Sequence, residues 1–314
     1  MNMRKQIEKV HFQITRNCNL RCAFCGQWGK KGFFSDASGE EISLCDWKRV
    51  ISELEACREK TKISPQITVW GGEPLVSPYF DTILQILKNK NFETEVITNG
   101  VLMDKHEDVI KNCVDTLYIS LDGTKEIHDE IRGRGVFDTV CKNIKSLKHD
   151  NIIVMSVITP KLIDVLPKFL EELESLNIKA LYLQDMIGLS GEEINEYERW
   201  MKETFNITAK DIKAWKNDSL FRVQDIQTGD FSYKIEHKKH ISTKEIHCKF
   251  PFNHVHIAWN GNVLYCTDFY DFSAGNIKDD TLQNIFFNKI SEKYREEIVK
   301  NNCITCKHCS WRNS

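Results

Sequence analysis

Cys18-Asn19-Leu20-Arg21-Cys22-Ala23-Phe24-Cys25 brings three thiols together within eight residues, directly after the extended-looking run His11–Thr15. Three thiolates are too few to complete a four-coordinate structural zinc site by themselves. They are the number that holds three irons of a cubane iron–sulfur cluster and leaves the fourth iron open to another ligand. The spacing therefore favours a cluster, with a partial zinc knuckle or three unrelated thiols as the alternatives.

Three further segments are strand-like runs that end in glycine and polar residues. They are Ile67-Thr68-Val69-Trp70-Gly71-Gly72-Glu73-Pro74, Val96-Ile97-Thr98-Asn99-Gly100 and Leu117-Tyr118-Ile119-Ser120-Leu121-Asp122-Gly123. Glycine lets the main chain approach a ligand closely, and a carboxylate such as that of Glu73 suits an ammonium group. Together with the three thiols, and in this order along the chain, the segments resemble the radical S-adenosylmethionine (radical SAM) enzymes.

The resemblance implies a catalytic 4Fe–4S cluster held by Cys18, Cys22 and Cys25. In that family S-adenosylmethionine chelates the free iron, and an electron from the cluster breaks a carbon–sulfur bond to release a 5′-deoxyadenosyl radical. The residues that the resemblance assigns to cofactor binding are Phe24 near the adenine, Gly71, Gly72, Glu73 and Pro74 at the methionine end, Ser120 and Asp122 at the ribose or carboxylate, Asn99, and Arg132 against the carboxylate. An ordinary surface arginine is the alternative for Arg132. Val157 and Met186 are candidates to border the adenine, although core packing explains both. No catalytic side chain can be named.

The composition sets broad limits on the class of protein. The 314 residues, 41% hydrophobic and 28% charged, are ordinary for a globular protein and suffice for one large and one small domain. A net charge of −2 gives no reason to expect nucleic acid or an anionic membrane as a partner. The N-terminus is polar and shows no signal region, and no apolar run reaches transmembrane length. In a chain without a secretory signal, the twelve cysteines are expected to be reduced thiols rather than disulfides. We therefore expect a cytoplasmic protein.

Strand-like and helical runs alternate along residues 1–188, which predicts an α/β fold with a parallel sheet. The apolar strand runs are short and continuous, which predicts strands buried on both faces. The resemblance makes the sheet a partial (β/α)6 TIM-like barrel, with functional residues at the C-terminal ends of the strands. The predicted strands are 10–15, 66–70, 94–98, 116–121, 152–158 and 179–184, and the predicted helices are 42–60, 79–89, 104–112, 137–148 and 163–176.

Residues 189–245 separate the predicted barrel domain, 1–188, from a C-terminal domain, 246–314. Helices are predicted over 191–204 and 208–217, and the remainder of the segment is polar, lysine-rich and aperiodic. This composition favours a solvated connector, with a role in lining the substrate entrance as the alternative.

The C-terminal domain begins with a predicted β-hairpin over residues 254–266. Asn260-Gly261 joins its two alternating apolar runs, and this dipeptide is typical of a tight turn in which both residues adopt positive φ. A helix is predicted around 281–299.

Five cysteines flank or follow the hairpin: Cys248, Cys266, Cys303, Cys306 and Cys309. Four thiolates with a terminal Cys-x2-Cys suit zinc as well as a cluster. The arrangement resembles the SPASM extension of radical SAM enzymes or its shortened form, the twitch domain. The resemblance implies one auxiliary 4Fe–4S cluster held by Cys248, Cys266 and two of the last three thiols, of which Cys306 and Cys309 match better. The nearby His247, His254, His256 and His308 are predicted to be exposed or hydrogen-bonded rather than ligands.

The resemblance implies a radical SAM oxidoreductase or maturase that takes a hydrogen atom from a small molecule or a peptide. It also implies a one-electron reductant such as flavodoxin or ferredoxin. The chain starts close to its first predicted strand, which slightly favours a small molecule. The rival function is a non-catalytic zinc or iron–sulfur protein, whether structural, electron-carrying or sensing. The remaining thiols are predicted to be small buried apolar residues, with hydrogen-atom donation as the alternative: Cys45, Cys57, Cys113 and Cys141.

Overall fold

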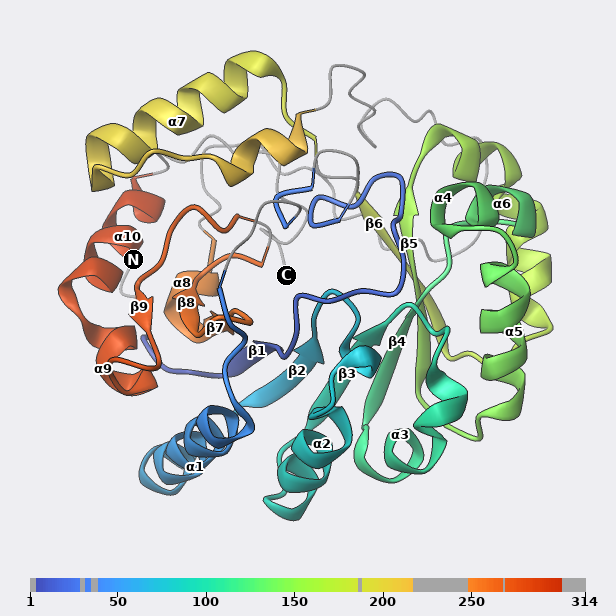
Figure 1. The fold of residues 1–314 in the computed structure, drawn as a ribbon, viewed down its shortest axis with the longest axis horizontal. Helices are drawn as coiled ribbons and strands as arrows, with labels where there is room; N and C mark the ends of the chain where they lie inside the picture. Colours follow the sequence, from blue (N-terminus) through green and yellow to red (C-terminus); the bar gives the residue numbers. More distant parts are fainter. Residues whose placement is uncertain are drawn as a thin grey trace.

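The computed structural model describes residues 4–28, 32–34, 39–185, 188–216, 248–267 and 269–300. Its framework is one curved sheet in which six parallel strands follow one another in chain order, with helices on the outside (Figure 1). The predicted α/β fold with a parallel sheet is confirmed, and the curvature is that of a partial TIM-like barrel. The six strands are β1 (Lys9–Gln13), β2 (Gln66–Trp70), β3 (Thr94–Thr98), β4 (Thr116–Ser120), β5 (Ile152–Ile158) and β6 (Ala180–Asp185).

Helices carry the chain back from the end of each strand to the start of the next. The first of them begins after Ser43, whose hydroxyl accepts a hydrogen bond from the Asp46 N–H while the Asp46 carboxylate accepts one from the Ser43 N–H. This capping box satisfies backbone donors that a helix start leaves open. The connecting elements are α1 (Leu44–Thr61), the 3-10 turn η1 (Pro74–Val76), α2 (Phe80–Asn89), the 3-10 turn η2 (Met103–Lys105), α3 (Glu107–Cys113), α4 (Lys125–Arg132), α5 (Val136–Ser146) and α6 (Pro160–Glu174).

Helix α4 is absent from the sequence-based prediction. Its eight residues are mostly charged, and only Ile127 and His128 are buried, so no apolar period marks it. It follows Gly123, which has a φ of +100° and turns the chain sharply after β4. The helix matters because its last residue, Arg132, reaches the candidate site described below.

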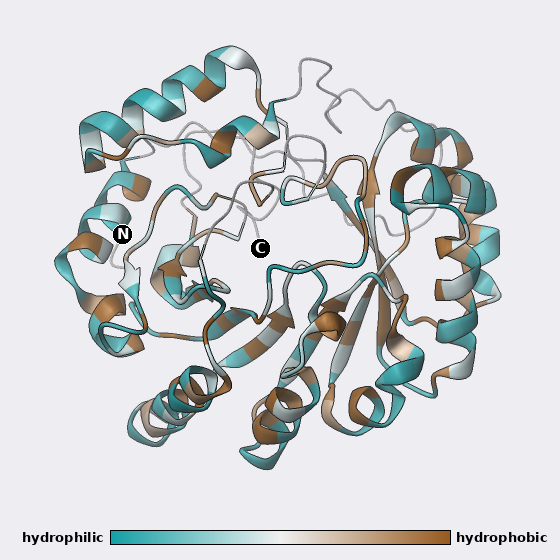
Figure 2. Cartoon of the chain, viewed as in Figure 1, coloured by the Kyte–Doolittle hydropathy of each residue, from teal (hydrophilic) through white to brown (hydrophobic). Residues whose placement is uncertain are grey.

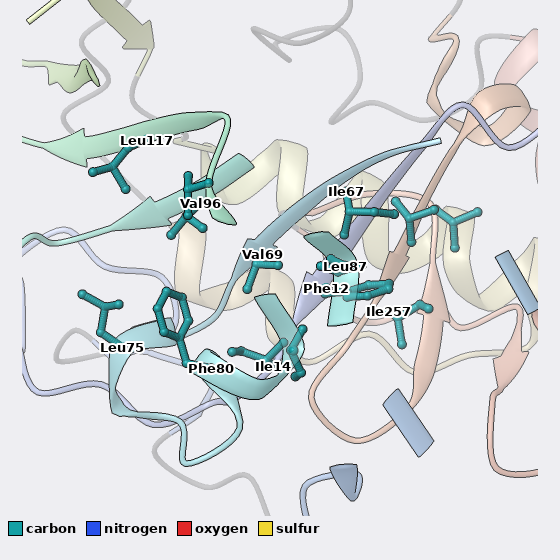
Figure 3. Close-up of a cluster of buried hydrophobic side chains, with 14 of the residues drawn as sticks. Phe12, Ile14, Ile67, Val69, Leu75, Phe80, Leu87, Val96, Leu117 and Ile257 are labelled. Atoms are coloured by element: carbon teal, nitrogen blue, oxygen red, sulfur yellow. The ribbon is translucent and has the colours of Figure 1, made fainter. Parts of the chain in front are cut away.

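The two faces of the barrel strands differ in chemistry. Phe12, Val69 and Val96 point outward and pack with the helices in a continuous apolar core (Figure 3). Their neighbours along each strand point into the barrel, because successive strand residues face opposite sides. Burial alternates strictly along β5, so the prediction of strands buried on both faces is wrong there: the inner face borders cavities. In Figure 2 strand β5 is largely hydrophobic, and the helices outside the sheet carry hydrophobic residues together with hydrophilic ones.

The C-terminal hairpin continues the sheet beyond β1. β7 (His254–Ile257) pairs in parallel with β1, and β8 (Asn262–Leu264) and β9 (Gly275–Asn276) follow in antiparallel order. The SPASM-like region therefore shares its sheet with the barrel. The predicted domain boundaries at 188/189 and 245/246 stay predictions.

The hairpin turn differs from the prediction, because only Gly261 has a positive φ, at +91°. The Gly261 N–H donates to Ala258 O at 2.9 Å, and the Ala258 N–H donates to Asn262 O at 2.8 Å. The connection is thus a turn over residues 258–261 that ends in a left-handed glycine, a bulged three-residue loop rather than a two-residue one.

Helices α8 (Phe250–Asn253), α9 (Leu282–Phe287) and α10 (Lys289–Val299) accompany the hairpin. The single helix predicted around 281–299 is two helices, because Asn288 ends α9 and caps α10. The Asn288 side chain accepts a hydrogen bond from the Ser291 N–H at 2.8 Å.

Along the chain, the barrel strands are followed by α7 (Gly191–Phe205) and the 3-10 turn η3 (Asp211–Trp215), and the hairpin comes after them. The helix predicted over 208–217 is this shorter turn, which Asp271 holds by accepting hydrogen bonds from the N–H groups of Asp211 at 2.9 Å and Ile212 at 3.1 Å. None of the helices that the structure describes is both long enough and apolar enough to cross a membrane.

Candidate functional site

Residues 14–28 follow β1 and carry the three thiols; we call them the cysteine loop. The loop is hydrogen-bonded to the segment after β2: the Gly72 N–H donates to Thr15 O at 2.9 Å, and the Glu73 N–H donates to Asn17 O at 2.8 Å. A Cβ on Gly72 would lie 2.4 Å from Asn17 O, far inside contact distance. Gly72 therefore allows the backbone of the cysteine loop to lie against the segment after β2, and no sequence pattern indicates this role.

Glu41 also shapes the cysteine loop, and no sequence signal points to it. Its Oε1 accepts hydrogen bonds from Thr15 Oγ1 at 2.7 Å and from the Arg16 N–H at 2.8 Å. On the other side, the Trp28 indole N–H donates to Arg16 O at 2.5 Å. The backbone just before the first cysteine is thus fixed by two side chains from different parts of the chain.

The three thiols border one cavity of about 280 Å³ at the C-terminal ends of the strands; we call it the thiol cavity. Backbone N–H groups point at two of the sulfurs, from Leu20 to Cys18 Sγ at 3.4 Å and from Trp28 to Cys25 Sγ at 3.3 Å. Burial raises the pKa of the Cys18 thiol to about 12 and also raises the pKa of the Cys22 thiol. Cluster ligation must therefore displace protons from these thiols.

The donor set fits a multi-iron cluster better than a single ion. In the described part of the chain, no three His, Cys, Asp or Glu side chains converge where one metal ion could bind. The thiols of Cys18, Cys22 and Cys25 instead surround a space, and N–H groups directed at sulfur are typical outer contacts of iron–sulfur clusters.

Glu73 lies in the wall of the thiol cavity and is 1% exposed. Its Oε1 accepts hydrogen bonds from Thr98 Oγ1 at 2.7 Å and the Leu75 N–H at 3.1 Å, and its Oε2 accepts one from the Asn99 N–H at 2.7 Å. Burial raises the pKa of Glu73 to about 7, although these donors favour the charged form. The carboxylate is therefore held in one orientation.

Arg132 lines the thiol cavity beside Cys22. Its Nε donates to Asp122 Oδ2 at 2.6 Å, and its Nη1 lies 3.9 Å from Cys22 Sγ. Asp122 lies behind Arg132, is 1% exposed, and accepts a hydrogen bond from the Val157 N–H at 2.9 Å through Oδ1. The structure thus gives Asp122 a contact with Arg132 and no place in the cavity wall.

Most of the predicted cofactor residues border the thiol cavity. Those that line it, besides the three cysteines, are Phe24, Gly71, Gly72, Glu73, Asn99, Ser120, Arg132 and Val157. Pro74 opens η1 and does not line it, as Asp122 does not. Met186 lies outside the described residues. The roles assigned to these side chains stay predictions.

Sequence reasoning missed several residues of the cavity wall, of which Trp215 stands out. A Cβ on Gly26 would lie 2.4 Å from the Trp215 ring, so the indole packs directly on the cysteine loop. Trp215 lies at the end of η3, in the segment that was interpreted as a solvated connector. The alternative interpretation of this segment, a role in lining the substrate entrance, stays a prediction. The other wall residues without a sequence signal include Trp70, Gln184 and Thr267.

The hairpin carries two of the predicted auxiliary ligands. Cys248 lies just before α8, and Cys266 follows β8 closely. Cys303, Cys306, Cys309, His247 and His308 lie outside the described residues, so the auxiliary ligand set stays a prediction.

The two described hairpin histidines are only partly hydrogen-bonded. His254 Nδ1 lies 2.7 Å from Asn253 Oδ1, and His256 Nδ1 lies 3.3 Å from Cys266 O. His256 Nε2 is buried and has no hydrogen-bond partner in the described part of the chain. Burial lowers the pKa of each ring to about 4. The prediction of satisfied histidines thus holds for one nitrogen of each ring.

The four scattered cysteines lie away from both the thiol cavity and the barrel interior. Cys113 is buried, as predicted, whereas Cys45 is exposed and Cys57 and Cys141 are half-buried. The prediction of small buried residues is therefore wrong for Cys45, which lies on the outer side of α1.

The sequence matches the radical SAM superfamily over residues 12–177 and the iron–sulfur cluster-binding SPASM domain over residues 248–310. The first match covers more than half of the chain, so the protein belongs to the radical SAM superfamily. It is an enzyme of the kind that binds S-adenosylmethionine and a 4Fe–4S cluster in the barrel and auxiliary iron–sulfur clusters in a SPASM domain.

Individual relatives cover most of the chain. The antilisterial bacteriocin subtilosin biosynthesis protein AlbA of Bacillus subtilis (strain 168) is 25% identical over 315 residues, which cover 95% of this chain and 65% of AlbA. The Fe-coproporphyrin III synthase of Methanosarcina barkeri is 22% identical over 333 residues, which cover 96% of this chain and 80% of that protein. The chain thus spans slightly under two thirds of the length of AlbA.

A solved structure shares the fold. Streptococcus suis SuiB bound to precursor peptide SuiA matches with a TM-score of 0.60 and 16% identity, over 98% of this chain and 72% of that chain.

Proposed function

We propose that the chain cleaves S-adenosylmethionine reductively and directs the resulting 5′-deoxyadenosyl radical at a carbon–hydrogen bond of a peptide substrate. The observation that carries the proposal is the thiol cavity. There Cys18, Cys22 and Cys25 share one space with the oriented carboxylate of Glu73 and the guanidinium of Arg132. The cluster and its bound S-adenosylmethionine would supply the radical, and the protein would supply binding, orientation and exclusion of water.

On this proposal each part of the cavity wall has a distinct task. The three thiolates hold the cluster. The fixed carboxylate of Glu73 receives the methionine ammonium group, and Arg132 pairs with the methionine carboxylate. Asp122 acts on Arg132 by holding its Nε at 2.6 Å, which leaves the outer nitrogens of the guanidinium to face the cavity.

The remaining wall residues bind the nucleoside and keep water out. Ser120 offers a hydroxyl to the ribose, and Phe24 and Val157 offer apolar surface to the adenine. Trp215 and Phe33 cover the side of the cavity next to the cysteine loop. Such cover protects a radical from side reactions with solvent.

Two comparisons support a peptide as the substrate. The relative AlbA takes part in the biosynthesis of a bacteriocin, and SuiB, which has the same fold, holds a precursor peptide. A second candidate substrate is a small molecule, which the relationship to the Fe-coproporphyrin III synthase favours.

The proposal extends to the partners of the enzyme. Cys248 and Cys266 with two of Cys303, Cys306 and Cys309 would hold one auxiliary 4Fe–4S cluster. A flavodoxin or ferredoxin would supply the electron. The chain has twelve cysteines, and the nine that the structure describes are free thiols. Free thiols suit the reducing cytoplasm.

The test is the metal content and electron paramagnetic resonance of anaerobically reconstituted protein. Wild type should hold about eight irons, and Cys18/Cys22/Cys25→Ala about four. The signal of the reduced wild-type cluster should change on addition of S-adenosylmethionine, and the variant should lack that response. Zinc in place of iron near Cys248 would remove the auxiliary cluster and leave the barrel chemistry standing. No iron at the three thiols would overturn the proposed function.

A further inference from the structure

A second cavity, of about 260 Å³, lies inside the barrel; we call it the lumen cavity. It adjoins the thiol cavity, since Ile97 and Thr267 line both. The lumen cavity lies closer to the N-terminal ends of the strands than the thiol cavity does. Tyr118 and Tyr182 line the lumen cavity, whereas the residues two positions further along the same strands, Ser120 and Gln184, line the thiol cavity. Residues two apart on a strand share a face and are separated by about 7 Å.

The charges in the lumen cavity cancel each other. Its described lining holds one cation and one anion, Lys9 and Glu95, and the Lys9 Nζ lies 2.7 Å from Glu95 Oε2. The hydroxyl of Thr68 donates to the same carboxylate at 2.8 Å. A charged group that entered would be buried without a partner, at high cost in free energy. The cavity therefore suits an uncharged ligand.

Two imidazoles in the cavity wall have unused hydrogen-bonding capacity. Neither ring nitrogen of His11 hydrogen-bonds to a described residue, and His254 uses only Nδ1, towards Asn253. Burial lowers the pKa of His11 well below its usual range and the pKa of His254 to about 4. At neutral pH both rings are uncharged, and each has a donor nitrogen and an acceptor nitrogen.

The rest of the wall is flat and largely apolar. Phe250 stacks on His254 with ring centroids 4.3 Å apart, and Tyr118, Tyr182 and Met155 complete the surface. Such rings favour an aromatic guest in stacked or edge-to-face contact. The volume lies just under the range of pockets for drug-sized ligands, so it suits one side chain rather than a whole small molecule.

We propose that the lumen cavity is the substrate subsite and that it takes an uncharged aromatic side chain with a hydrogen-bonding group, the phenol of a tyrosine in a peptide. This inference rests on the proposed function and adds the class of substrate side chain. His11 and His254 hydrogen-bond the phenol, and the paired Lys9 and Glu95 exclude charged side chains. Because the two cavities adjoin, a phenol held in the lower one places the backbone of its residue towards the thiol cavity.

The test uses four probes that share one ring: p-cresol, toluene, p-toluate and 4-methylbenzylammonium. Their binding to anaerobically reconstituted holoenzyme is measured by ligand-observed NMR titration. We expect p-cresol to bind about tenfold more tightly than toluene, as one net hydrogen bond allows, and the two ions not to saturate the site. Equal binding of toluene and p-cresol, tighter binding of either ion, or no saturable p-cresol binding would overturn the assignment.

Variants place the binding in the lumen cavity. His11→Phe and His254→Phe keep an aromatic ring and remove the nitrogens, so each should lower the preference for p-cresol over toluene from about tenfold towards one. His106→Phe changes a histidine on the outer side, between α2 and α3, and should keep the wild-type preference. If neither cavity variant changes the preference, p-cresol binds elsewhere and the inference fails. Circular dichroism identifies a variant that does not fold, and the other cavity variant then decides.

The outcome separates this inference from the proposed function. Cleavage of S-adenosylmethionine is measured on the same preparation. Cleavage without a preference for p-cresol rejects the lumen assignment alone. A preference for p-cresol without cleavage rejects the proposed function and leaves the uncharged aromatic site in place.

Discussion

On β1, Val10 and Phe12 point towards the helices and are completely buried, whereas their neighbours Lys9 and His11 point into the barrel and line the lumen cavity. The outer face joins a continuous apolar core that holds the sheet to its helices. The inner face borders two cavities, and in the lumen cavity His11 has no hydrogen bond to a described residue while His254 has one, to Asn253. The outer face of the strands thus stabilises the fold, whereas the inner face lines the cavities. Substitutions on the outer face should therefore lower stability more than substitutions on the inner face.

The largest expected effect on stability belongs to the outer face. Phe12→Ala removes a fully buried ring between β1 and α1 and should lower the free energy of unfolding by about 3–5 kcal/mol. His11→Ala, one residue away on the inner face, breaks no hydrogen bond within the described chain and should cost less than about 1.5 kcal/mol. Urea denaturation of both variants measures the difference. Equal losses would show that the inner face also carries the stability of the sheet.

A smaller effect should appear as a pH dependence of the inner face. The pKa of Glu73 is raised from 4.5 to about 7 by burial, so the folded protein holds a proton that the unfolded chain releases between these values. This contribution to stability is fully present below pH 4.5 and is lost as the pH rises through 7. The lost stability amounts to about 3 kcal/mol.

Comparison with Glu73→Gln isolates this carboxyl from other groups. The buried histidines, whose pKa values are lowered, change stability in the opposite sense, because folding disfavours their protonation. Denaturation of metal-free wild type and variant at several pH values should show the advantage of wild type shrinking from pH 4.5 to 7. A difference that stays constant over this interval would mean that Glu73 remains ionised in the fold.

Gly72 tests how tightly the cysteine loop is packed. Gly72→Ala would place a Cβ 2.3 Å from Arg16 O, so we expect a loss of about 2 kcal/mol in unfolding free energy and a fall in iron bound by the barrel. Gly191→Ala is the matched control, since its Cβ would meet only the Lys216 side chain, at 3.9 Å. Thermal melts and iron assays report the two effects. Normal iron content in Gly72→Ala would show that the loop adjusts freely.

The smallest effect should come from the cap of α1, whose residues line neither cavity. Ser43→Ala removes the hydroxyl that accepts the Asp46 N–H and should cost about 1 kcal/mol. Because α1 lies on the outer side of the sheet, the yield of 5′-deoxyadenosine per folded protein should stay at the wild-type level. A large loss of that yield would link the outer helices to the chemistry of the inner face.

Local patterns predicted the strands and the thiol motif, but not the contacts between distant segments. The strands at 66–70, 94–98 and 152–158 have the predicted extents, because each is a short run rich in β-branched residues that is followed by Gly-Gly, Asn-Gly or Thr-Pro. Helix α4 was not predicted, because it is short and mostly charged and has no apolar period. The contact of Glu41 with the cysteine loop was not predicted, because its partners, Thr15 and Arg16, are about 25 residues away in sequence and share no periodic pattern with it.

The candidate site shows the same limit. The family resemblance named Glu73 and Arg132 as candidates, and both line the thiol cavity. The position of Asp122 behind Arg132, the packing of Trp215 on Gly26 and the polar lumen depend on how strands and loops meet in space. A sequence motif names the residue type that a ligand needs, whereas the register of the strands decides which neighbours reach the cavity.

Reductive cleavage at the three thiols is measured by the formation of 5′-deoxyadenosine from S-adenosylmethionine by anaerobically reconstituted, dithionite-reduced protein, followed by liquid chromatography and mass spectrometry. We expect wild type to form 5′-deoxyadenosine and Cys18/Cys22/Cys25→Ala to form none. Equal amounts from both proteins, or none from wild type that holds a full complement of iron, would show that the three thiols do not support cleavage of S-adenosylmethionine.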